Sequence, residues 1–563
     1  MSYELLLMNI ARNASERLPH FRECLGQHLI ASYVEQYGYS VRVYSGDVLE
    51  CEKVLCREIE FHKVRMIGFY IGADTLSVVI NVIKWLKKKY SVTVFVGGPE
   101  AYATGKDFLK SCPCDYVIPG EGEKPVLGLL KYVIDGYGVL KNIRSLRYCD
   151  DTGTYYENAL EEPIQDLDSL PFPKRKNSLN KTFRMNSSIG ILTGRGCPYH
   201  CSFCFEGATS KLVRFRSVKN VIAEIEEVHK ENPNLKCVNV YDDTFTLQRQ
   251  RIEEFCKYMK RKGLLWTCEG HVARICHEPD LMKKMVESGL IAMQIGIESG
   301  SRKVLEAYNK NTTPEMIQKA VSICKQAGLI TLEGNYIIGG AFETEETIHE
   351  SIEHAKSLLE IGRGMIELST VFFAPYCGTP ITKNPEKFGI TIEKELNKHI
   401  VFTMRDAVVT TNGMSTEQII KAKQKFDEEI TKKYYLEAIK CTKTELLRGA
   451  SRNNRQMRIN PNWCIAWERY SYLKNFMRHF DIREQTIDSH KFPVRTVSEY
   501  IYKEDVLLAG DVKLQGMDAK YVVWADGRRS ICEIAEQEGI VLEQVLDKYT
   551  ELNEKGYVYF SKF

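Results

Sequence analysis

Three cysteines, Cys197, Cys201 and Cys204, lie close together in the chain, with three residues between the first two and two between the last two. An apolar run at residues 189–192 precedes them and predicts a buried strand that leads into the cysteines. Three thiolates at this spacing can bind three irons of a [4Fe–4S] cluster and leave the fourth iron without a protein ligand. Such an iron can bind a substrate or a cofactor and pass it an electron.

Two other uses of these cysteines agree less well with the pattern. A structural zinc site needs a fourth ligand, for which His200 is the nearest candidate. A disulfide scaffold is typical of short secreted chains, whereas the 18 cysteines here are scattered over 563 residues and we expect no secretory signal at Met1–Met8. We therefore expect most of the other cysteines to be reduced and buried.

The cysteine spacing, with Phe203 directly before the last cysteine, resembles that of the radical S-adenosylmethionine (SAM) enzymes. The resemblance implies that the fourth iron binds the amino and carboxylate groups of SAM. It also implies that the cluster cleaves SAM reductively to a 5′-deoxyadenosyl radical. Cys197, Cys201 and Cys204 are then the cluster ligands, and Phe203 belongs to the SAM site.

A series of alternating strands and helices surrounds the cysteines. We predict six strands, at residues 187–194, 237–242, 266–271, 292–297, 332–338 and 368–374. Helical stretches separate them, for example at 218–231, 249–262 and 314–327. Six such units match the partial (β/α)6 TIM barrel that the resemblance implies, and we assign this radical SAM core to residues 187–390. Chemistry in such barrels lies at the carboxyl ends of the strands, so polar residues there are candidates for SAM contacts.

Four strand ends supply these candidates. Asp243 follows the second strand and meets the SAM ammonium group, contacts the substrate or caps a helix. Arg274, after the third strand, either pairs with the SAM carboxylate or forms a surface ion pair. The fourth strand ends Gly-Ile-Glu-Ser-Gly-Ser, which in the family places Glu298 on the SAM ribose hydroxyls with Ser299 beside it. Gly339 ends the fifth strand and is implied to leave room for the adenine.

Residues 1–150 predict a second α/β unit ahead of the barrel. Five short apolar strands, at 4–10, 40–44, 66–70, 93–99 and 115–118, alternate with helices and indicate a parallel, doubly wound, Rossmann-like sheet. Ligands of such sheets bind at the carboxyl strand ends, where glycine-rich turns allow close backbone approach. The order Val-Gly-Gly-Pro, then Asp-Tyr-Val-Ile-Pro-Gly-Glu-Gly-Glu, resembles the cobalamin-binding domain of B12-dependent radical SAM enzymes. The candidate cobalamin contacts come from three turns: Gly72, Ala73, Asp74, Thr75, Gly97, Gly98, Pro99, Gly120, Glu121, Gly122 and Glu123.

One common feature of cobalamin domains is missing from this segment. Many carry Asp-x-His-x-x-Gly, whose histidine ligates cobalt, but His20, His28 and His62 lack that context. In the B12-dependent radical SAM branch this absence is common and leaves the lower face of cobalt open to water or another side chain. The alternative is a Rossmann-like domain that binds no cobalamin and only supports the barrel.

The remaining segments are a linker and a helical region. Residues 151–186 are polar and contain Pro171 and Pro173, which favour an extended connection between the two domains. Residues 391–495 are rich in helix formers, including a long amphipathic stretch at 416–435, and predict a helical C-terminal region.

Residues 496–563 predict a small winged-helix-like domain with a strand at 520–525, helices at 531–535 and 541–552, and a strand at 556–560. Its Asp-Gly-x-x-Ser-Ile-x-Glu-Ile-Ala text resembles peptide-recognition domains of enzymes that modify ribosomally made peptides, which take a leader peptide as an added strand. A purely structural cap is the alternative. The mixed charge of this segment does not favour DNA binding.

The composition sets limits on partners. A net charge of +3 with 27% charged residues is too mild to indicate nucleic acid or a membrane surface as a partner. We find no apolar run long enough to cross a bilayer, so we expect a cytoplasmic protein.

These observations predict an enzyme that uses a [4Fe–4S] cluster, SAM and cobalamin, most simply a C-methyltransferase acting on an unactivated carbon. The substrate is a small molecule or a ribosomally made peptide, and an electron donor such as flavodoxin or ferredoxin is expected. Two alternatives stay open. One is a radical SAM enzyme that forms rings, rearranges or crosslinks without methyl transfer, and the other is an iron–sulfur redox or peptide-binding regulator.

Overall fold

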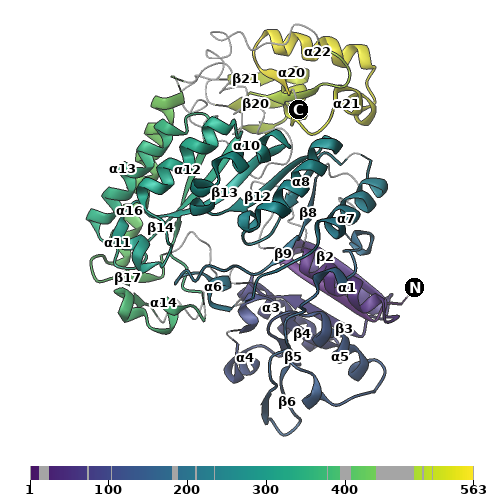
Figure 1. Cartoon of the computed structure of the whole chain (residues 1–563). Helices are drawn as coiled ribbons and strands as arrows, with labels where there is room; N and C mark the ends of the chain where they lie inside the picture. The colour runs from purple at the N-terminus through teal and green to yellow at the C-terminus, as the bar shows by residue number, and fades with distance from the viewer. Residues whose placement is uncertain are drawn as a thin grey trace.

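The computed structural model contains three parts along the chain, shown in Figure 1 as a purple-to-blue sheet domain, a teal-to-green barrel and a yellow C-terminal part. It describes residues 2–11, 24–72, 75–102, 104–179, 188–209, 212–233, 235–376, 378–393, 407–438, 440, 487–496, 500–509 and 512–561. Two predicted cobalamin contacts, Ala73 and Asp74, lie outside these residues, as does most of the predicted helical region after residue 440.

The first sheet is parallel and doubly wound, as predicted. Five parallel strands run in the order β2-β1-β3-β4-β5, and two antiparallel strands, β6 and β7, extend its edge. The strands are β1 (Leu5–Ala11), β2 (Val41–Asp47), β3 (Met66–Tyr70), β4 (Thr93–Gly97), β5 (Tyr116–Ile118), β6 (Arg147–Cys149) and β7 (Tyr155–Glu157). The sequence analysis did not anticipate β6 and β7, and β7 lies within the stretch that it assigned to the linker.

Helices cover both faces of this sheet and form two separate apolar cores. One core packs α2 (Val48–Glu60) and α3 (Leu76–Lys89) against the strands, and the other packs α1 (Leu25–Glu35) and α5 (Glu123–Val133). Most side chains of the five parallel strands are buried, because a parallel sheet covered on both faces has no solvated side.

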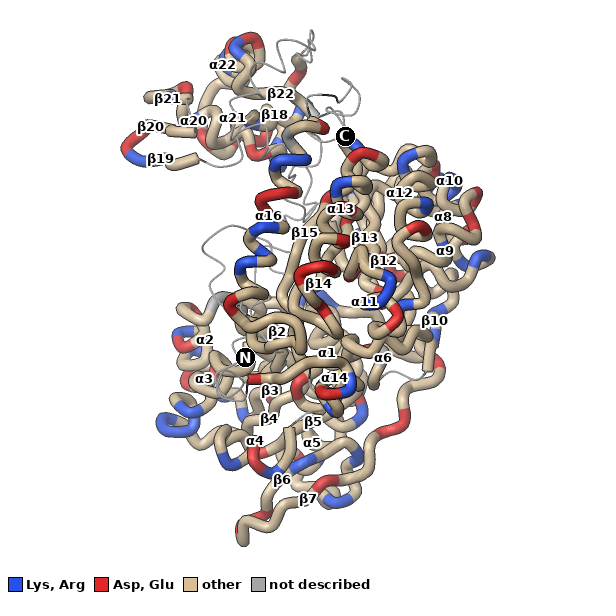
Figure 2. The backbone as a smooth tube through the Cα atoms, turned by 90° about the vertical axis from the view of Figure 1, so that its left-hand side faces the viewer, with Lys and Arg blue, Asp and Glu red and all other residues tan. Residues whose placement is uncertain are grey.

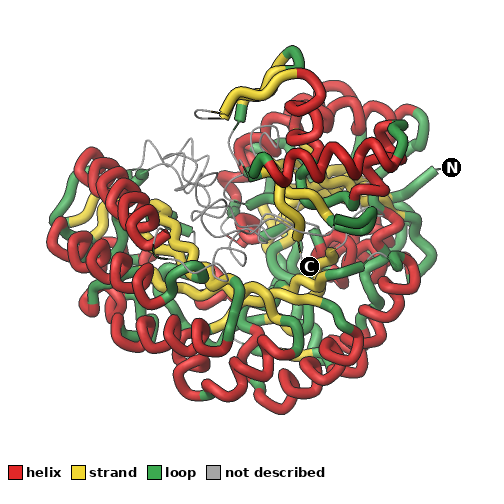
Figure 3. The backbone as a smooth tube through the Cα atoms, turned by 90° about the horizontal axis from the view of Figure 1, so that it is seen from above, coloured by secondary structure: helices red, strands yellow, loops and turns green. Residues whose placement is uncertain are grey.

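The second sheet contains the six predicted barrel strands, all parallel, in the order β15-β14-β13-β12-β11-β8. They are β8 (Ser188–Ile191), β11 (Cys237–Val240), β12 (Leu265–Gly270), β13 (Leu290–Glu298), β14 (Thr331–Ile338) and β15 (Ile366–Phe372). Seen from above, these strands form a crescent inside an outer row of helices (Figure 3). The three helices named from the sequence are found with unchanged bounds: α7 (Val218–Glu231), α8 (Arg249–Lys262) and α12 (Pro314–Ala327).

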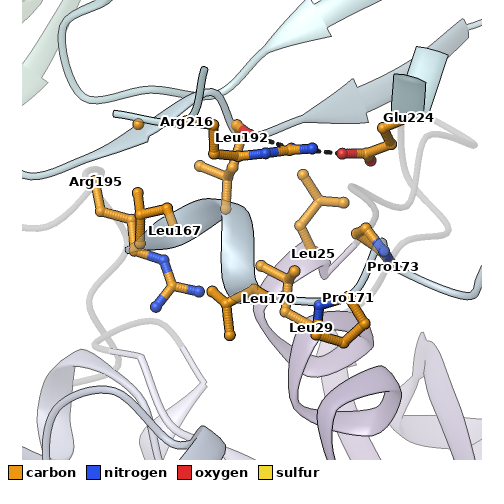
Figure 4. Close-up of a pocket in the computed structure, with 11 residues that line it drawn as sticks. Leu25, Leu29, Leu167, Leu170, Pro171, Pro173, Leu192, Arg195, Arg216 and Glu224 are labelled. Atoms are coloured by element: carbon orange, nitrogen blue, oxygen red, sulfur yellow. Dashed lines mark hydrogen bonds and ion pairs between the residues drawn. The ribbon is translucent and has the colours of Figure 1, made fainter. Parts of the chain in front are cut away.

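The linker packs between α1 and the first barrel strand. Its side chains Leu167, Leu170, Pro171 and Pro173 surround a small apolar cavity together with leucines of α1 and Leu192 (Figure 4). At the upper side of this cavity Arg216 is ion-paired with Glu224 of α7 at 2.5 Å.

The linker residue Arg175 reaches the same carboxylate. Its guanidinium lies 3.3 Å from Glu224, and both side chains are almost completely buried. Arg175 also donates to the Gly190 carbonyl at 2.6 Å. This buried triad of Arg175, Glu224 and Arg216 therefore ties the linker to the start of the barrel.

A long helix, α16 (Thr416–Ala438), packs against β15 and against α13 (Glu345–Ile361). Acidic and basic bands alternate along it (Figure 2), and the ion pairs Lys423–Asp427 and Lys433–Glu437 join residues four apart. This helix begins at the residue predicted from the sequence.

The C-terminal part contains an antiparallel three-stranded sheet, β19 (Ile501–Lys503), β20 (Val506–Ala509) and β21 (Val512–Gln515), which the sequence analysis missed. Three helices follow, α20 (Gly516–Trp524), α21 (Ile531–Glu538) and α22 (Leu542–Glu554), and then β22 (Val558–Ser561), which pairs with β18 (Phe492–Arg495).

The predicted strand at 520–525 is wrong, because residues 520–524 belong to helix α20 and Ala525 caps its end. The β-branched and aromatic text of Tyr521 to Trp524 favours a strand, but strand propensity is easily overridden by packing. In the helix, Ala519 and Val522 are buried in the domain core, and the Tyr521 ring lies 5.3 Å from that of Tyr549 on α22. The helix at α21 is capped as expected, with Ser530 and Glu533 forming a capping box.

Within the described residues, no helix combines the length and the apolar character that are needed to cross a membrane.

Candidate active site between the two sheets

The loop that carries the cysteines is held by a buried polar network. Asp242, which follows β11, accepts from the Thr193 backbone N–H at 2.6 Å and from the Thr193 hydroxyl. Arg251 of α8 donates to the Thr193 carbonyl at 2.6 Å. The pKa of Asp242 is raised by burial, which the Arg251 charge opposes. The chain therefore leaves β8 in one fixed direction, toward the cysteines.

The three cysteines of the loop differ in their exposure to solvent. Cys201 is buried, whereas Cys197 and Cys204 are partly exposed. Burial raises the pKa of the Cys201 thiol to about 11, so a bound metal would be needed to hold it as a thiolate at neutral pH. Among the described residues no group of His, Cys, Asp or Glu converges on a single metal ion. A [4Fe–4S] cluster fits this loop nonetheless, because each of its cysteine ligands binds a different iron.

Glu298 lies at a β-bulge in strand β13. The pairing of β13 with β14 shifts register between Gly296 and Glu298, and Glu298 has a φ of +64°. Bulges of this kind redirect a side chain and occur beside active sites. The redirected carboxylate lies 2.7 Å from the Lys310 ammonium group, and both side chains are buried.

Lys310 is a site residue that the sequence analysis missed. Its ammonium group lies 5.8 Å from the centre of the Phe203 ring, in the cysteine loop. The pKa of Lys310 is raised despite its burial, because Glu298 and the thiols of Cys201 and Cys204 are close. A lysine in a turn beyond the strand-end glutamate has no distinctive spacing, so only the tertiary contact identifies it.

His271 and Tyr199 form a second contact with the cysteine loop. Their rings stack with centroids 3.7 Å apart and planes 10° apart. His271 Nδ1 accepts from the Ala273 N–H at 3.2 Å and caps helix α9 (Val272–His277). Burial and the Lys310 charge lower the pKa of His271 to about 3, so its ring is neutral.

The other predicted SAM contacts have structural partners. Arg274 donates to the Thr246 carbonyl at 3.1 Å and pairs with Glu278, which matches the ion-pair alternative. Ser299 is buried and bonds to the Ser351 hydroxyl at 3.0 Å. A Cβ on Gly339 would meet Ile419 of α16 at 2.9 Å, so its missing side chain admits that helix. Their contacts with SAM stay predictions.

A cavity of about 660 Å³ lies between the carboxyl ends of the first sheet and the cysteine loop. From the first sheet it is lined by seven of the predicted cobalamin contacts, five of them glycine or proline and two acidic: Gly97, Gly98, Pro99, Gly120, Gly122, Glu121 and Glu123, with Tyr70 and Tyr102 beside them. Gly72 and Thr75 are not among its described lining residues. The Thr75 hydroxyl accepts from the Gly72 N–H at 3.0 Å in the turn that starts α3.

The cavity wall depends on one glycine and presents one polar group that fits cobalamin. Gly98 has a φ of +115° and a Cβ there would meet the Ile71 carbonyl at 2.7 Å, so glycine is needed for this wall to form. Gln27 of α1 lines the cavity and is buried, and its Oε1 has no hydrogen-bond partner among the described residues. Cobalamin carries amide side chains that can satisfy such an acceptor.

Two carboxyl groups face the cavity from the barrel side. Glu206 follows the last cysteine in the helix α6 (Phe205–Thr209), and Asp243 accepts from the Gly196 N–H at 3.2 Å. Burial, together with the nearby Asp243 charge, raises the pKa of Glu206 to about 7. Asp243, predicted to contact SAM, thus lies where the cavity meets the cysteine loop.

Comparisons with known proteins agree with this two-part site. A family model of the radical SAM superfamily matches residues 191–355, and one of the B12 binding domain matches residues 23–130. An uncharacterized methyltransferase of Pyrococcus horikoshii is 31% identical over 341 residues, which cover 60% of this chain and 71% of that protein. The chain belongs to the B12-binding radical SAM family. The predicted cofactor set of a [4Fe–4S] cluster, SAM and cobalamin is the set of this family, and the chain is an enzyme.

One further relative and one solved structure also resemble this radical SAM enzyme. An anaerobic magnesium-protoporphyrin IX monomethyl ester cyclase of Rubrivivax gelatinosus is 29% identical over 273 residues, and the chain spans about half of it, 49%. The solved structure of the cobalamin-dependent radical enzyme OxsB, with aqua-cobalamin and SAM bound, gives a TM-score of 0.61 at 15% identity. That alignment covers 98% of this chain and 84% of OxsB, and it shows a shared fold.

Proposed function

We propose that this radical SAM enzyme is a methyltransferase that acts on an unactivated carbon. The observation that carries the proposal is the single cavity lined both by the glycine turns of the first sheet and by Gly194, Arg195 and Gly196 of the cysteine loop. When bound, the cluster, SAM and cobalamin supply a substrate radical and a methyl donor. The Pyrococcus relative, which is named a methyltransferase, supports the same proposal.

The chain's own residues contribute position and charge. The Asp242 and Arg251 network fixes the direction of the cysteine loop, and Glu298 with Lys310 forms a buried ion pair beside it. Tyr102 of the first domain packs edge-on against Phe205, with ring centroids 5.6 Å apart. Holding two reacting centres in one enclosed space lowers the entropic part of the barrier. The electron that starts the reaction comes from a separate donor protein, as the family implies.

The test follows a label and needs no knowledge of the substrate. The full chain is reconstituted with iron, sulfide and cobalamin, reduced, and given SAM with a trideuterated methyl group. A methyltransferase transfers the label from the sulfonium sulfur of SAM to the corrin fraction and releases S-adenosylhomocysteine in equal amount. Release of 5′-deoxyadenosine with no labelled corrin would refute methyl transfer and favour ring formation or rearrangement, the reaction class that the name of the cyclase relative suggests.

Cys201→Ala is the matched control for this experiment. The variant lacks one predicted cluster ligand, so we expect it to lose 5′-deoxyadenosine formation. Labelling of the corrin requires no radical and should persist in the variant. Loss of both activities together would mean that the cysteine loop is needed for folding of the cavity.

We further propose that the substrate is carried on a peptide that binds the C-terminal sheet. Strand β19 lies at the sheet edge, and all three of its side chains are exposed. The two-residue turn at Glu504 and Asp505 makes Lys503 and Val506 a hydrogen-bonded pair, so the Tyr502 N–H and carbonyl point away from β20. An extended peptide can pair with these groups as an added strand.

Tyr502→Pro removes this outward N–H without removing a bond of the sheet, and Tyr502→Phe is its matched control. Peptides selected on the full chain from a random phage-displayed library should bind the Phe variant as they bind the natural chain, and the Pro variant at least tenfold more weakly. Equal binding to both variants would refute the edge as the docking site.

A further inference from the structure

Four charged side chains cross the boundary between the two domains. Glu121 and Glu123 follow β5, and Arg195 and Arg214 belong to the short strands β9 (Gly194–Arg195) and β10 (Arg214–Phe215). Arg195 lies 2.5 Å from Glu123 and 3.3 Å from Glu121. Arg214 lies 2.6 Å from Glu121 and donates to the Ile164 carbonyl at 2.7 Å. We call these four charged residues the interdomain clamp.

The clamp is largely shielded from solvent. The Glu123 and Arg214 side chains are only 3% and 9% exposed, and those of Arg195 and Glu121 are 17% and 23% exposed. Ion pairs that are removed from water are screened little by salt and leave a costly unpaired charge when one partner is lost. The clamp therefore differs from an ordinary surface salt bridge, whose geometry is loose.

One side of the clamp adjoins the cluster loop directly. Arg195 lies two residues before Cys197, separated from it only by Gly196. Strands β9 and β10 pair antiparallel, with Arg195 opposite Arg214, so the ladder holds the two arginines side by side. A shift of Arg195 would therefore be passed through Gly196 to Cys197, the first predicted cluster ligand.

The other side of the clamp is the wall of the predicted cobalamin cavity. Glu121 lies between Gly120 and Gly122, and all three line the cavity. The Ile164 N–H donates to Glu121 at 3.0 Å, which fixes this carboxylate from a second direction. The carboxylates that the sequence analysis assigned to cobalamin are thus directed at arginines of the barrel.

We propose that the interdomain clamp sets the distance between the cobalamin site and the cluster, and that its members are positioning residues. This inference rests on the proposed methyl transfer, because that reaction needs the radical and the methyl donor on one substrate. A displacement of about 1 Å of a reacting group can cost about a hundredfold in rate. A clamp that ties the cavity wall to the residue two before Cys197 controls such a displacement directly.

The test uses three variants of the reconstituted full chain: Arg195→Glu, Glu123→Arg, and the two combined. Reduced cluster and cob(II)alamin are both paramagnetic, so pulsed electron paramagnetic resonance reports the distance between them without any turnover. We expect one narrow distance in the natural chain, a broad or shifted distribution in each single variant, and a return toward the narrow distance in the double variant.

Turnover gives the second readout. Each single variant should lose at least tenfold in methylated product per 5′-deoxyadenosine formed, and the double variant should recover part of that loss. Lys110→Gln, which removes the exposed Lys110–Asp107 pair of the same domain, is the matched control and should change neither the distance nor the ratio.

Two results would overturn the inference. One is an unchanged narrow distance in both single variants. The other is loss of cobalamin from Glu123→Arg with full retention in Arg195→Glu, which would mean that the carboxylate contacts the cofactor. If the natural chain transfers no methyl group, the proposed function fails, but the distance measurement still decides whether the clamp sets the spacing.

Discussion

Replacing Glu224 by Gln tests whether the linker is locked to the barrel by charge. Glu224 contacts Arg216 at 2.5 Å and Arg175 at 3.3 Å, and its side chain is 1% exposed. The glutamine keeps the size of the side chain but leaves two buried guanidinium groups facing each other without a carboxylate. Removing one partner of a buried ion pair costs about 3–5 kcal/mol.

The same helix supplies the control. Glu226, two residues along α7, pairs with Lys262 at 2.7 Å, but both side chains are 31–43% exposed. Exposed pairs contribute about 0–1 kcal/mol, so Glu226→Gln should be close to neutral. The two variants remove the same charge from the same helix, one from a buried site beside two arginines and one from a partly exposed site beside Lys262 and the Tyr258 hydroxyl.

The assay is thermal unfolding of the full chain, combined with hydrogen exchange of the linker. A change of 1 kcal/mol moves the midpoint of a domain of this size by about 2–4 °C, so Glu224→Gln should lower the barrel transition by about 6–20 °C. The amides that bond within Lys174–Ser178 should exchange faster in this variant alone. Equal shifts in the two variants would refute the reasoning, because they would show that burial of the triad carries no special cost.

Three other outcomes follow from the structure. Burial lowers the pKa of His28 to about 4, below its unfolded value of about 6.5. Between these pH values unfolding takes up a proton, so the free energy of unfolding should fall by up to about 3 kcal/mol as the pH drops from 6.5 to 4. His28→Gln should flatten that dependence in denaturant titrations at several pH values, and an unchanged slope would contradict it. Cys201→Ala should lose the visible absorption of the cluster after reconstitution, whereas Cys256→Ala, which alters another buried thiol of the barrel, should keep it. Lys310→Met should weaken SAM binding roughly 10- to 100-fold, because it removes a charge-assisted contact of about 1.5–3 kcal/mol that orients Glu298. Calorimetry measures this affinity, and an unchanged value would show that Glu298 and Lys310 do not belong to the SAM site.

Much of the fold could be predicted because its signals are local. The barrel strands are short apolar runs between helices with clear periodicity, and α7, α8 and α12 match their predicted bounds. The failure at α20 has the opposite cause. Its Val-Val-Trp text favours a strand, whereas burial of Val522 in the domain core and packing of Tyr521 against Tyr549 favour the helix.

The candidate site likewise has a part that the local sequence predicts and a part that depends on tertiary contacts. The three cysteines are near one another in sequence, so their spacing alone indicates the cluster. Lys310 reaches Glu298 through a bulge and a turn, and no spacing rule predicts such a contact. The predicted adenine contact of Gly339 stays a prediction, and only the tertiary structure shows that Ile419, eighty residues later, packs beside this glycine.

What the amino-acid sequence by itself determined is the chemistry: a three-thiolate cluster loop, a six-stranded barrel and a doubly wound sheet with glycine turns. These depend on residue type, short spacing and periodicity, which are written along the chain. What only the tertiary structure decided is how the two halves meet. The sequence around Glu121 and Glu123 does not tell whether they contact a cofactor or an arginine. The tertiary structure identifies the interdomain clamp, because it brings Arg195 and Arg214 opposite these two carboxylates. The physical reason is that an ion pair depends on distance in space, and a sequence records only distance along the chain.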